Sequence, residues 1–349
     1  MFTYWGLFLI FAAGTLLNRP EAGRRDWVML LLLATVPTAL MVGLRWKVGP
    51  DWQAYSSIYE YSRLFDLHQL MQRADPGFSV LMWLLHGADA PFWALNLLCG
   101  LVFVTGLTVF CRRQPNPWLA WLVAFPYLVV VIGMSALRQS VALGFLFLAI
   151  NAYERRSLSR FTLFIAVGAS FHGSLMLMLP ICLLSYTRNN FRRFGLLLLA
   201  AVFGPYFLHD TFETYARRYS SHEIQSTGVA YRVAMNALAA ILFLLLRKRF
   251  DFEEHMDKLW RNFSLLTFAL ALLLFVVPSS TAIDRMILYL FPLQLVILSR
   301  APRVIGGTPK AAGQFALAVI GYCALMLIVF LKFGAASSWY VPYQTIFSA

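Results

Sequence analysis

The chain has 349 residues, of which 60% are hydrophobic and only 13% are charged, and its mean hydropathy is +0.67. Soluble domains carry about 45–50% apolar and about 25% charged residues, so this composition excludes a soluble globular protein and indicates a polytopic membrane protein. The net charge of +13 lies mainly in short basic clusters between apolar runs, which is typical of topology signals and not of nucleic-acid binding. The cysteines lie in or beside apolar runs without metal or disulfide spacing, so we expect packing residues, with neither a metal nor a cofactor.

Apolar runs long enough to form membrane-spanning helices recur along the whole chain. A helix needs about 20 apolar residues to cross a hydrocarbon core of about 30 Å. The first run begins at Phe2 with no basic segment or cleavage site, so we expect a retained span and not a signal peptide. The predicted spans lie near residues 2–17, 27–44, 91–111, 117–133, 137–153, 194–209, 230–246, 260–277, 283–299 and 313–333. We therefore predict an all-α fold, a single transmembrane bundle over residues 1–349 with about ten spans.

Two further apolar stretches are too short or too interrupted to be simple spans. The run from Phe78 to His86 is expected to dip into the membrane without crossing it. The run 161–184 is interrupted by Phe171-His172-Gly173, so we expect two short helices that meet at His172 and return to the side they entered. Non-helical backbone at that depth is tolerated only where it is buried in protein or lines a cavity. His172 is then either a polar residue satisfied by a backbone carbonyl or an acid or base near a cavity.

Basic clusters between the runs set the expected orientation, because Lys and Arg are retained on the cytoplasmic side. The clusters expected there are Arg19/Arg24/Arg25, Arg112/Arg113, Arg155/Arg156/Arg160, Arg188/Arg192/Arg193, Arg247/Lys248/Arg249 with Lys258/Arg261, and Arg300/Arg303/Lys310. These clusters lie on the same side of the membrane only if the run 161–184 does not cross it. With that arrangement, both termini are expected outside the cytoplasm.

The other basic residues fall on the extracytoplasmic face, against the sorting rule. They are Arg45, Lys47, Arg63, Arg73, Arg138, Arg217, Arg218, Arg232, Arg285 and Lys332. Many of the acidic residues share that face, and some of these arginines are expected merely to pair with them. Their number nevertheless predicts a polar site on this face, to which the external loops 45–77 and 210–230 contribute.

Three of these arginines stand at the outer ends of predicted spans: Arg138, Arg232 and Arg285. A guanidinium at the bilayer centre costs about 2.5–3.5 kcal/mol on insertion scales, so Arg138 either snorkels to the headgroups or faces an anion within the bundle. We favour the anion, and predict that the three arginines converge on it, because guanidinium forks match phosphate oxygens. The alternative for Arg285 is neutralisation by the adjacent Asp284.

Aromatic residues in loop 45–77 recur at helical spacing. Trp52, Tyr55, Ile58 and Tyr59 predict an amphipathic helix that lies at the membrane interface. Asp51 precedes it and is suited to cap its first turn. Aromatic rings beside carboxylates also suit sugars, whose C–H faces stack on rings; the alternative is an aromatic anchor in the headgroup layer.

Several short motifs together resemble the EpsG-like family of Wzy-type polysaccharide polymerases. The motifs are Gly49-x-Asp51-x-x-x-Tyr55, Asp75-Pro-Gly-Phe78, Ser135-x-x-Arg138-Gln139-x-x-Ala142, Phe171-His172-Gly-Ser174 followed by Pro180, and Asp284-Arg285-x-x-x-Tyr289. The motifs occur in the same order as in the family and extend over residues 45 to 292. One residue departs from the family pattern: Trp52 occupies a position where the family commonly has tyrosine. The resemblance implies an extracytoplasmic polymerase of undecaprenyl-diphosphate-linked oligosaccharide repeats in the bacterial cytoplasmic membrane, which transfers the growing glycan from its lipid carrier to an incoming repeat.

The candidate residues fit such a glycosyl transfer. We expect a base among His172, Asp51 and Asp75, and diphosphate binding by the three arginines, which stabilise the leaving charge. The sugar-binding candidates are Trp52, Tyr55, Tyr59, Gln139 and Asp284. The expected partners are the lipid-linked oligosaccharide, membrane lipid, and a chain-length regulator or flippase, without nucleic acid. The alternatives are a transporter or flippase of lipid-linked sugars, and a membrane glycan acyltransferase with His172 as its base.

Overall fold

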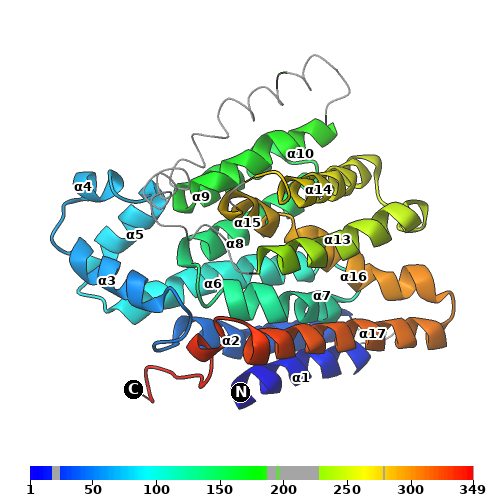
Figure 1. Cartoon of the computed structure of the whole chain (residues 1–349), viewed down its shortest axis with the longest axis horizontal. Helices are drawn as coiled ribbons and strands as arrows, with labels where there is room; N and C mark the ends of the chain where they lie inside the picture. The colour runs from blue at the N-terminus through cyan, green and yellow to red at the C-terminus, as the bar shows by residue number, and fades with distance from the viewer. Residues whose placement is uncertain (18–23, 187–194, 196–227, 278–279, 349) are drawn as a thin grey trace.

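The computed structural model describes residues 1–17, 24–186, 195, 228–277 and 280–348. Every regular element in these ranges is a helix, so the predicted all-α fold class is confirmed. The longer helices are α1 (Phe2–Leu17), α2 (Arg24–Gly43), α6 (Phe92–Cys111), α7 (Pro117–Ala124) continued by η1 (Phe125–Ile132), α8 (Leu137–Glu154), α9 (Leu158–Phe171), α13 (Val229–Leu246), α14 (Glu254–Leu273), α16 (Phe291–Gly306), and α17 (Pro309–Ile328) continued by η4 (Val329–Phe333). The shorter ones are α3 (Trp52–Ser62), α4 (Leu67–Met71), α5 (Pro76–Gly87), η2 (Gly173–Leu177), α10 (Met178–Tyr186), η3 (Arg247–Arg249), α15 (Thr281–Leu288) and η5 (Ser337–Trp339). Most long helices run in one common direction, and α3, α4 and α5 project at one end of the bundle (Figure 1).

Helices occupy every predicted span except 194–209, of which the structure describes only Gly195. Fewer of them than predicted are full-length spans. Among the described residues, three helices are long and apolar enough to cross a membrane alone, and a bent pair, α15 with α16, makes up to four. The other apolar helices are shorter, because polar or helix-breaking residues interrupt them. Pro126, for example, lies where α7 gives way to the π-helical η1, and proline removes one hydrogen-bond donor from a helix.

Close packing between α6 and α8 fixes the position of Arg138. A Cβ built on Gly106 would lie 2.2 Å from the carbonyl oxygen of Gly144, and one built on Gly144 would lie 2.9 Å from the Phe103 Cα. Small residues of this kind allow two membrane helices to approach closely. The N-terminal turn of α8, which carries Arg138, is therefore held on a rigid support.

The helix break predicted at His172 is present. Helix α9 ends at Phe171, His172 has extended backbone (φ −155°, ψ 103°), and η2 and α10 follow. The Tyr153 ring lies 5.5 Å from that of Phe161 near the start of α9, and 5.4 Å from that of Tyr186 at the end of α10. The two short helices therefore begin and end at the same end of the bundle, as the distribution of basic residues predicts.

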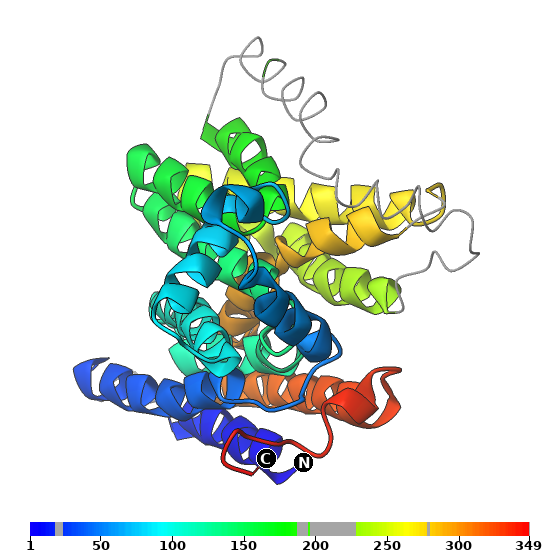
Figure 2. The same ribbon diagram turned by 90° about the vertical axis from the view of Figure 1, so that its left-hand side faces the viewer.

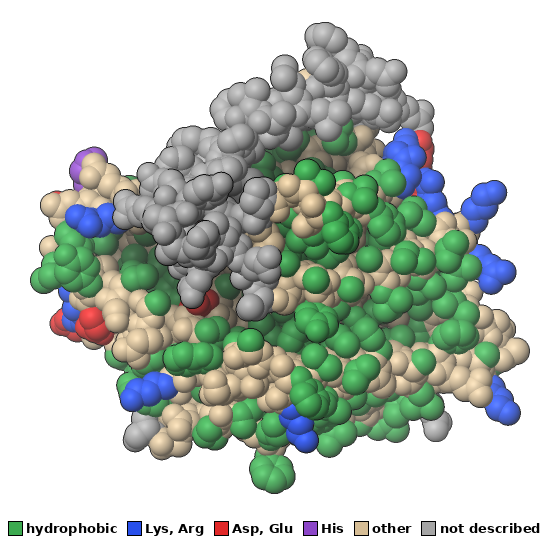
Figure 3. Space-filling model, viewed as in Figure 1, with side chains coloured by type: hydrophobic (Ala, Val, Ile, Leu, Met, Phe, Trp, Pro, Cys, Tyr) green, Lys and Arg blue, Asp and Glu red, His purple; other side chains and the backbone are tan. Residues whose placement is uncertain are grey.

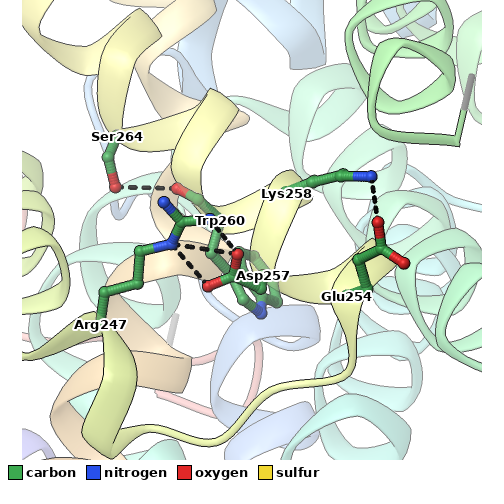
Figure 4. A network of polar contacts seen from close by, with 6 residues as sticks. All are labelled: Arg247, Glu254, Asp257, Lys258, Trp260 and Ser264. Carbon is green, nitrogen blue, oxygen red and sulfur yellow. Dashed lines mark hydrogen bonds and ion pairs between the residues drawn. The ribbon is translucent and has the colours of Figure 1, made fainter. Parts of the chain in front are cut away.

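The end of the bundle that holds Tyr153 carries a set of basic residues paired with acids. Arg247 Nε donates to both carboxylate oxygens of Asp257 at 2.8 and 3.0 Å, and Lys258 lies 2.6 Å from Glu254 (Figure 4). Lys and Arg side chains gather along the edge opposite α3–α5, while hydrophobic side chains cover much of the face between the two ends (Figure 3). This arrangement of an apolar middle between two polar ends is that of a multi-pass membrane protein.

Candidate functional site

A cluster of polar residues lies at the end of the bundle opposite the basic edge. It is built from the first residues of α3, α5 and α8, from the turn between α9 and η2, and from α15. Figure 2 views the molecule from this end, with the light-blue and cyan segments toward the viewer. The sequence-predicted residues of these segments, which are up to 234 positions apart from Asp51 to Arg285, therefore meet in one region.

Asp75 joins three of these segments. Its carboxylate accepts a hydrogen bond from Arg138 Nη1 at 2.7 Å and another from the backbone N–H of Gly173 at 3.2 Å. Tyr55 lies beside Arg138, since both line the same groove. A carboxylate held by a guanidinium favours its ionised form, so Asp75 is better placed to orient Arg138 and the His172 turn than to take up a proton.

His172 lies at the centre of the charged groups. It is only 8% exposed, and its Nε2 atom has no hydrogen-bond partner among the described residues. The guanidinium groups of Arg138 and Arg285 both lie within electrostatic range of it. A buried polar atom without a partner costs free energy, and the expectation of a side chain satisfied by a backbone carbonyl stays a prediction. The expectation of an acid or base remains a prediction.

Asp51 does not act as the helix cap that its position suggests. It occupies the N-cap position of α3 but makes no capping hydrogen bond. Its Oδ2 instead accepts a hydrogen bond from the Ser135 hydroxyl at 2.5 Å. The loop that carries Asp51 lies against the segment before α8, because a Cβ on Gly49 would fall 2.0 Å from the Met134 carbonyl oxygen.

Gly49→Ala is expected to destabilise the site strongly. Gly49 has φ +94°, and an alanine there would both strain the backbone and clash with Met134, at a cost of about 2 kcal/mol or more. The matched control is Gly307→Ala, where φ is +60° but nothing lies within 4 Å of the added Cβ. Thermal unfolding of the purified variants checks this: the larger loss is expected at Gly49, and equal losses would contradict the close approach.

Arg232 and Asp284 form an ion pair. The Arg232 guanidinium also lies 5.6 Å from the centre of the Tyr127 ring, within the range of a cation–π contact. Both charged residues of α15 interact with further groups. The ion pair links α13 to α15 and holds two of the predicted phosphate-binding arginines in one region.

Gln139 and Tyr289 connect this region to the His172 turn. Gln139 Nε2 donates to the backbone carbonyl of Arg285 at 3.3 Å. The hydroxyl of Tyr289 lies 3.1 Å from the Ser174 hydroxyl. Tyr289 and Ser174 both belong to the family-like motifs, but the sequence alone predicted no role for either residue. Their contact holds the end of α15 against η2.

The predicted sugar-binding aromatic residues lie in two different environments. Trp52 is 6% exposed and packs on Phe92, with ring centres 5.5 Å apart. Tyr59 is fully buried, and its hydroxyl donates to the Ala90 carbonyl at 2.7 Å. Both rings belong to a small core under α3, whereas Tyr55 is half-buried beside Arg138. Of the three, Tyr55 is the ring available to a substrate in this structure. The other predicted contributor, loop 210–230, lies almost entirely outside the described residues.

The C-terminal segment is a part of the site that sequence patterns did not predict. Tyr340 is buried, its hydroxyl donates to the Val131 carbonyl at 3.2 Å, and Asp51 and Arg232 are both within its electrostatic range. The backbone N–H of Gly49 donates to the Trp339 carbonyl at 2.8 Å. This segment therefore braces the Asp51 loop.

Arg45 strengthens the same brace. It is 1% exposed, and it donates from Nη1 to the Val42 carbonyl and, at 3.2 Å, from Nε to the Val48 carbonyl. Burial lowers the pKa of the Arg45 guanidinium to about 10, so it stays charged at neutral pH. Its backbone pairs with Thr345, which ties the last residues to the end of α2.

Tyr340→Phe is expected to lower activity more than its small effect on folding explains. Loss of the hydroxyl removes its hydrogen bond to the Val131 carbonyl, worth about 1 kcal/mol in stability, and takes a polar group away from the surroundings of Asp51. Tyr343→Phe is the matched control, because its hydroxyl donates to the Met41 carbonyl at 2.8 Å in the same segment. Turnover and thermal unfolding are measured for both variants. Equal losses of turnover in Tyr340→Phe and Tyr343→Phe would contradict a role of Tyr340 in the site.

These features define a multi-pass helical membrane protein with a charged, partly buried site at one end of its bundle. Comparison with family models then identifies the family: the EpsG model matches residues 28–345, and the chain belongs to the EpsG family, which is associated with exopolysaccharide biosynthesis. The EpsG membership expected from the motifs is confirmed, and every one of these motifs lies within the matched range. Comparisons with curated proteins and with solved structures found no match.

Proposed function

We propose that the protein polymerises oligosaccharide repeats carried on undecaprenyl diphosphate. The observation that carries this proposal is the placement of Arg138 and Arg285 within electrostatic range of the buried His172, next to an ion pair of Arg232 and Asp284. Cations suited to a diphosphate therefore lie beside a group suited to proton transfer. EpsG family membership supports the same function through its association with exopolysaccharide biosynthesis.

In the proposed reaction, a hydroxyl of the acceptor sugar attacks the anomeric carbon of the growing glycan. The bond between that carbon and the diphosphate oxygen breaks, and the diphosphate leaves with the electron pair. Arg138, Arg232 and Arg285 stabilise the charge that develops on it. The acceptor proton passes to His172, for which Asp51 is the second candidate, while Asp75 orients Arg138.

The sugar contacts are assigned to side chains that line the same region. Gln139 donates to the Arg285 carbonyl, Asp284 precedes Arg285 in α15, and Tyr55 lines the same groove as Arg138. Because Trp52 and Tyr59 are buried, we propose that they support α3 and contact sugar only if α3 moves.

We propose that the site faces the outside of the bacterial cytoplasmic membrane. The support is the separation of charge: the described basic clusters around Arg156 and Arg247 lie at the opposite end of the bundle, which the sorting rule places in the cytoplasm. A flippase would deliver the substrate to this side, and a chain-length regulator would act on the product.

The test is an assay of the purified protein, reconstituted in lipid, with one lipid-linked repeat. A polymerase produces a ladder of longer lipid-linked glycans and releases undecaprenyl diphosphate. A flippase moves the substrate between leaflets without a ladder, and an acyltransferase leaves the chain length unchanged and consumes an acyl donor. Absence of a ladder with active, folded protein would contradict the proposal.

A further inference from the structure

A groove opens between α3, α4 and α5, next to the site. Its volume is about 240 Å³. The lining comes from residues 55–82 except for Arg138, which α8 contributes. Arg138 also forms the ion pair with Asp75, so the groove leads directly to the charged cluster.

The groove is lined by apolar and aromatic side chains, with cations as its charged groups. Ile58, Phe65 and Met82 are among the apolar residues, and Arg73 lies over the Phe65 ring at 4.3 Å. The Ser62 hydroxyl is already engaged, with the Tyr59 carbonyl and with His86, both at 2.7 Å. The described lining contains neither a carboxylate nor a carboxamide. A sugar, which needs hydrogen-bond acceptors for its hydroxyls, would therefore be poorly satisfied there.

The outer side of the same helices is apolar and exposed. Ile58 and Tyr61, which line the groove, are 48% and 60% exposed, and Leu64 at the end of α3 is 73% exposed. Exposed apolar side chains on a short amphipathic helix are typical of an element that lies in the membrane interface. The groove thus connects an apolar surface to a buried guanidinium.

An apolar chain that ends in an anion satisfies both of these features. Resting on the proposed function, we propose that the groove binds the isoprenoid chain of a lipid-linked substrate next to its diphosphate. Arg138 contacts the diphosphate, while Ile58, Tyr61 and Phe65 pack on the first isoprene units. A single branched chain suits a groove of this size better than the paired acyl chains of a phospholipid. Tyr55 then stands where the chain meets the diphosphate.

The proposal is tested with a photoreactive C15 isoprenyl diphosphate and the full-length protein in nanodiscs. Crosslinked peptides identified by mass spectrometry are expected to fall within residues 55–82. Unlabelled C15 isoprenyl diphosphate is expected to compete, and phosphatidylglycerol is not. Labelling that falls elsewhere in the chain, or equal competition by phosphatidylglycerol, would overturn the proposal.

Two groove variants and one matched control sharpen the test. Ile58→Gln removes apolar contact and is expected to weaken binding of the C15 probe about tenfold. Ala74→Leu, which adds volume to a lining residue, is expected to weaken it by obstruction. Leu64→Gln is the control, because Leu64 is exposed on the same segment but does not line the groove. Wild-type binding by both groove variants would contradict the groove as the binding site.

Failure of this inference is distinct from failure of the proposed function. If the wild-type protein forms a product ladder but its crosslinks lie outside residues 55–82, the proposed polymerase function stands and the groove is rejected as the isoprenoid site. If the crosslinks lie in the groove but no ladder forms, the groove stands as an isoprenyl diphosphate site and the proposed polymerase function is rejected.

Discussion

Replacing Arg138 with alanine is expected to lower the rate of polymer formation about 100-fold or more, the usual effect of removing one group that stabilises a developing anion. Arg138 is the residue on which Asp75, Tyr55 and the groove converge. The variant also leaves the half-buried Asp75 carboxylate without its guanidinium. Arg138→Lys is expected to give an intermediate rate, because an ammonium keeps the charge but not the planar fork.

The control for Arg138 is an arginine in a similar ion pair at the opposite end of the bundle. Arg113 lies 2.6 Å from Glu154, and its side chain is 28% exposed. Arg138 lies 2.7 Å from Asp75, and the Arg138 side chain is 29% exposed. Arg113→Ala is expected to retain near-normal polymer yield. The measurement is the product ladder from purified variants, with thermal unfolding alongside. Comparable activity loss in both variants would show that arginine removal acts through folding.

Replacing His172 with glutamine is expected to lower the rate about 100-fold, in line with loss of a general base. Glutamine keeps a polar side chain of similar length but cannot act as a base. The residual rate is therefore expected to lose the dependence on pH that the base confers on the wild type. Rates of ladder formation measured from acidic to neutral pH, at saturating substrate, check both expectations.

His255 offers the matched control for His172. Both imidazoles are 8% exposed, and neither ring has a hydrogen bond at Nε2 among the described residues. His255 lies among Tyr153 and Tyr186, at the end of the bundle away from the site. His255→Gln is expected to keep both the rate and its pH profile. If it matched His172→Gln in both, burial of a histidine and not its position would explain the loss.

Much of the fold follows from local patterns. Apolar runs of bilayer length predict helices α1, α6, α13 and α17 almost to their ends, because a membrane imposes one length and one polarity on each span. The break at His172 follows from the glycine beside it and from the basic clusters on either side. Span lengths are harder to predict, because bends such as the one between α15 and α16, at 45°, depend on packing in three dimensions.

The candidate site was predicted less completely than the fold. The motifs place Asp51, Asp75, Arg138 and Arg285 in one region, but they do not say which acid pairs with which base. An aromatic repeat such as Trp52 and Tyr59 has the same spacing whether it faces a core or a substrate. Tyr340 carries no local signal at all, since its role arises only when the end of the chain folds back on the Asp51 loop.

The proposed polymerase function depends above all on which side of the membrane the charged cluster faces. All four native cysteines are buried, so single cysteines can be placed at the exposed Ser57 in α3 and Ser159 in α9 and labelled with a membrane-impermeant maleimide in intact spheroplasts. The account predicts that Ser57→Cys is labelled from outside, whereas Ser159→Cys is labelled only after the membrane is permeabilised. The reverse pattern would put the arginines and His172 in the cytoplasm and contradict an extracytoplasmic polymerase.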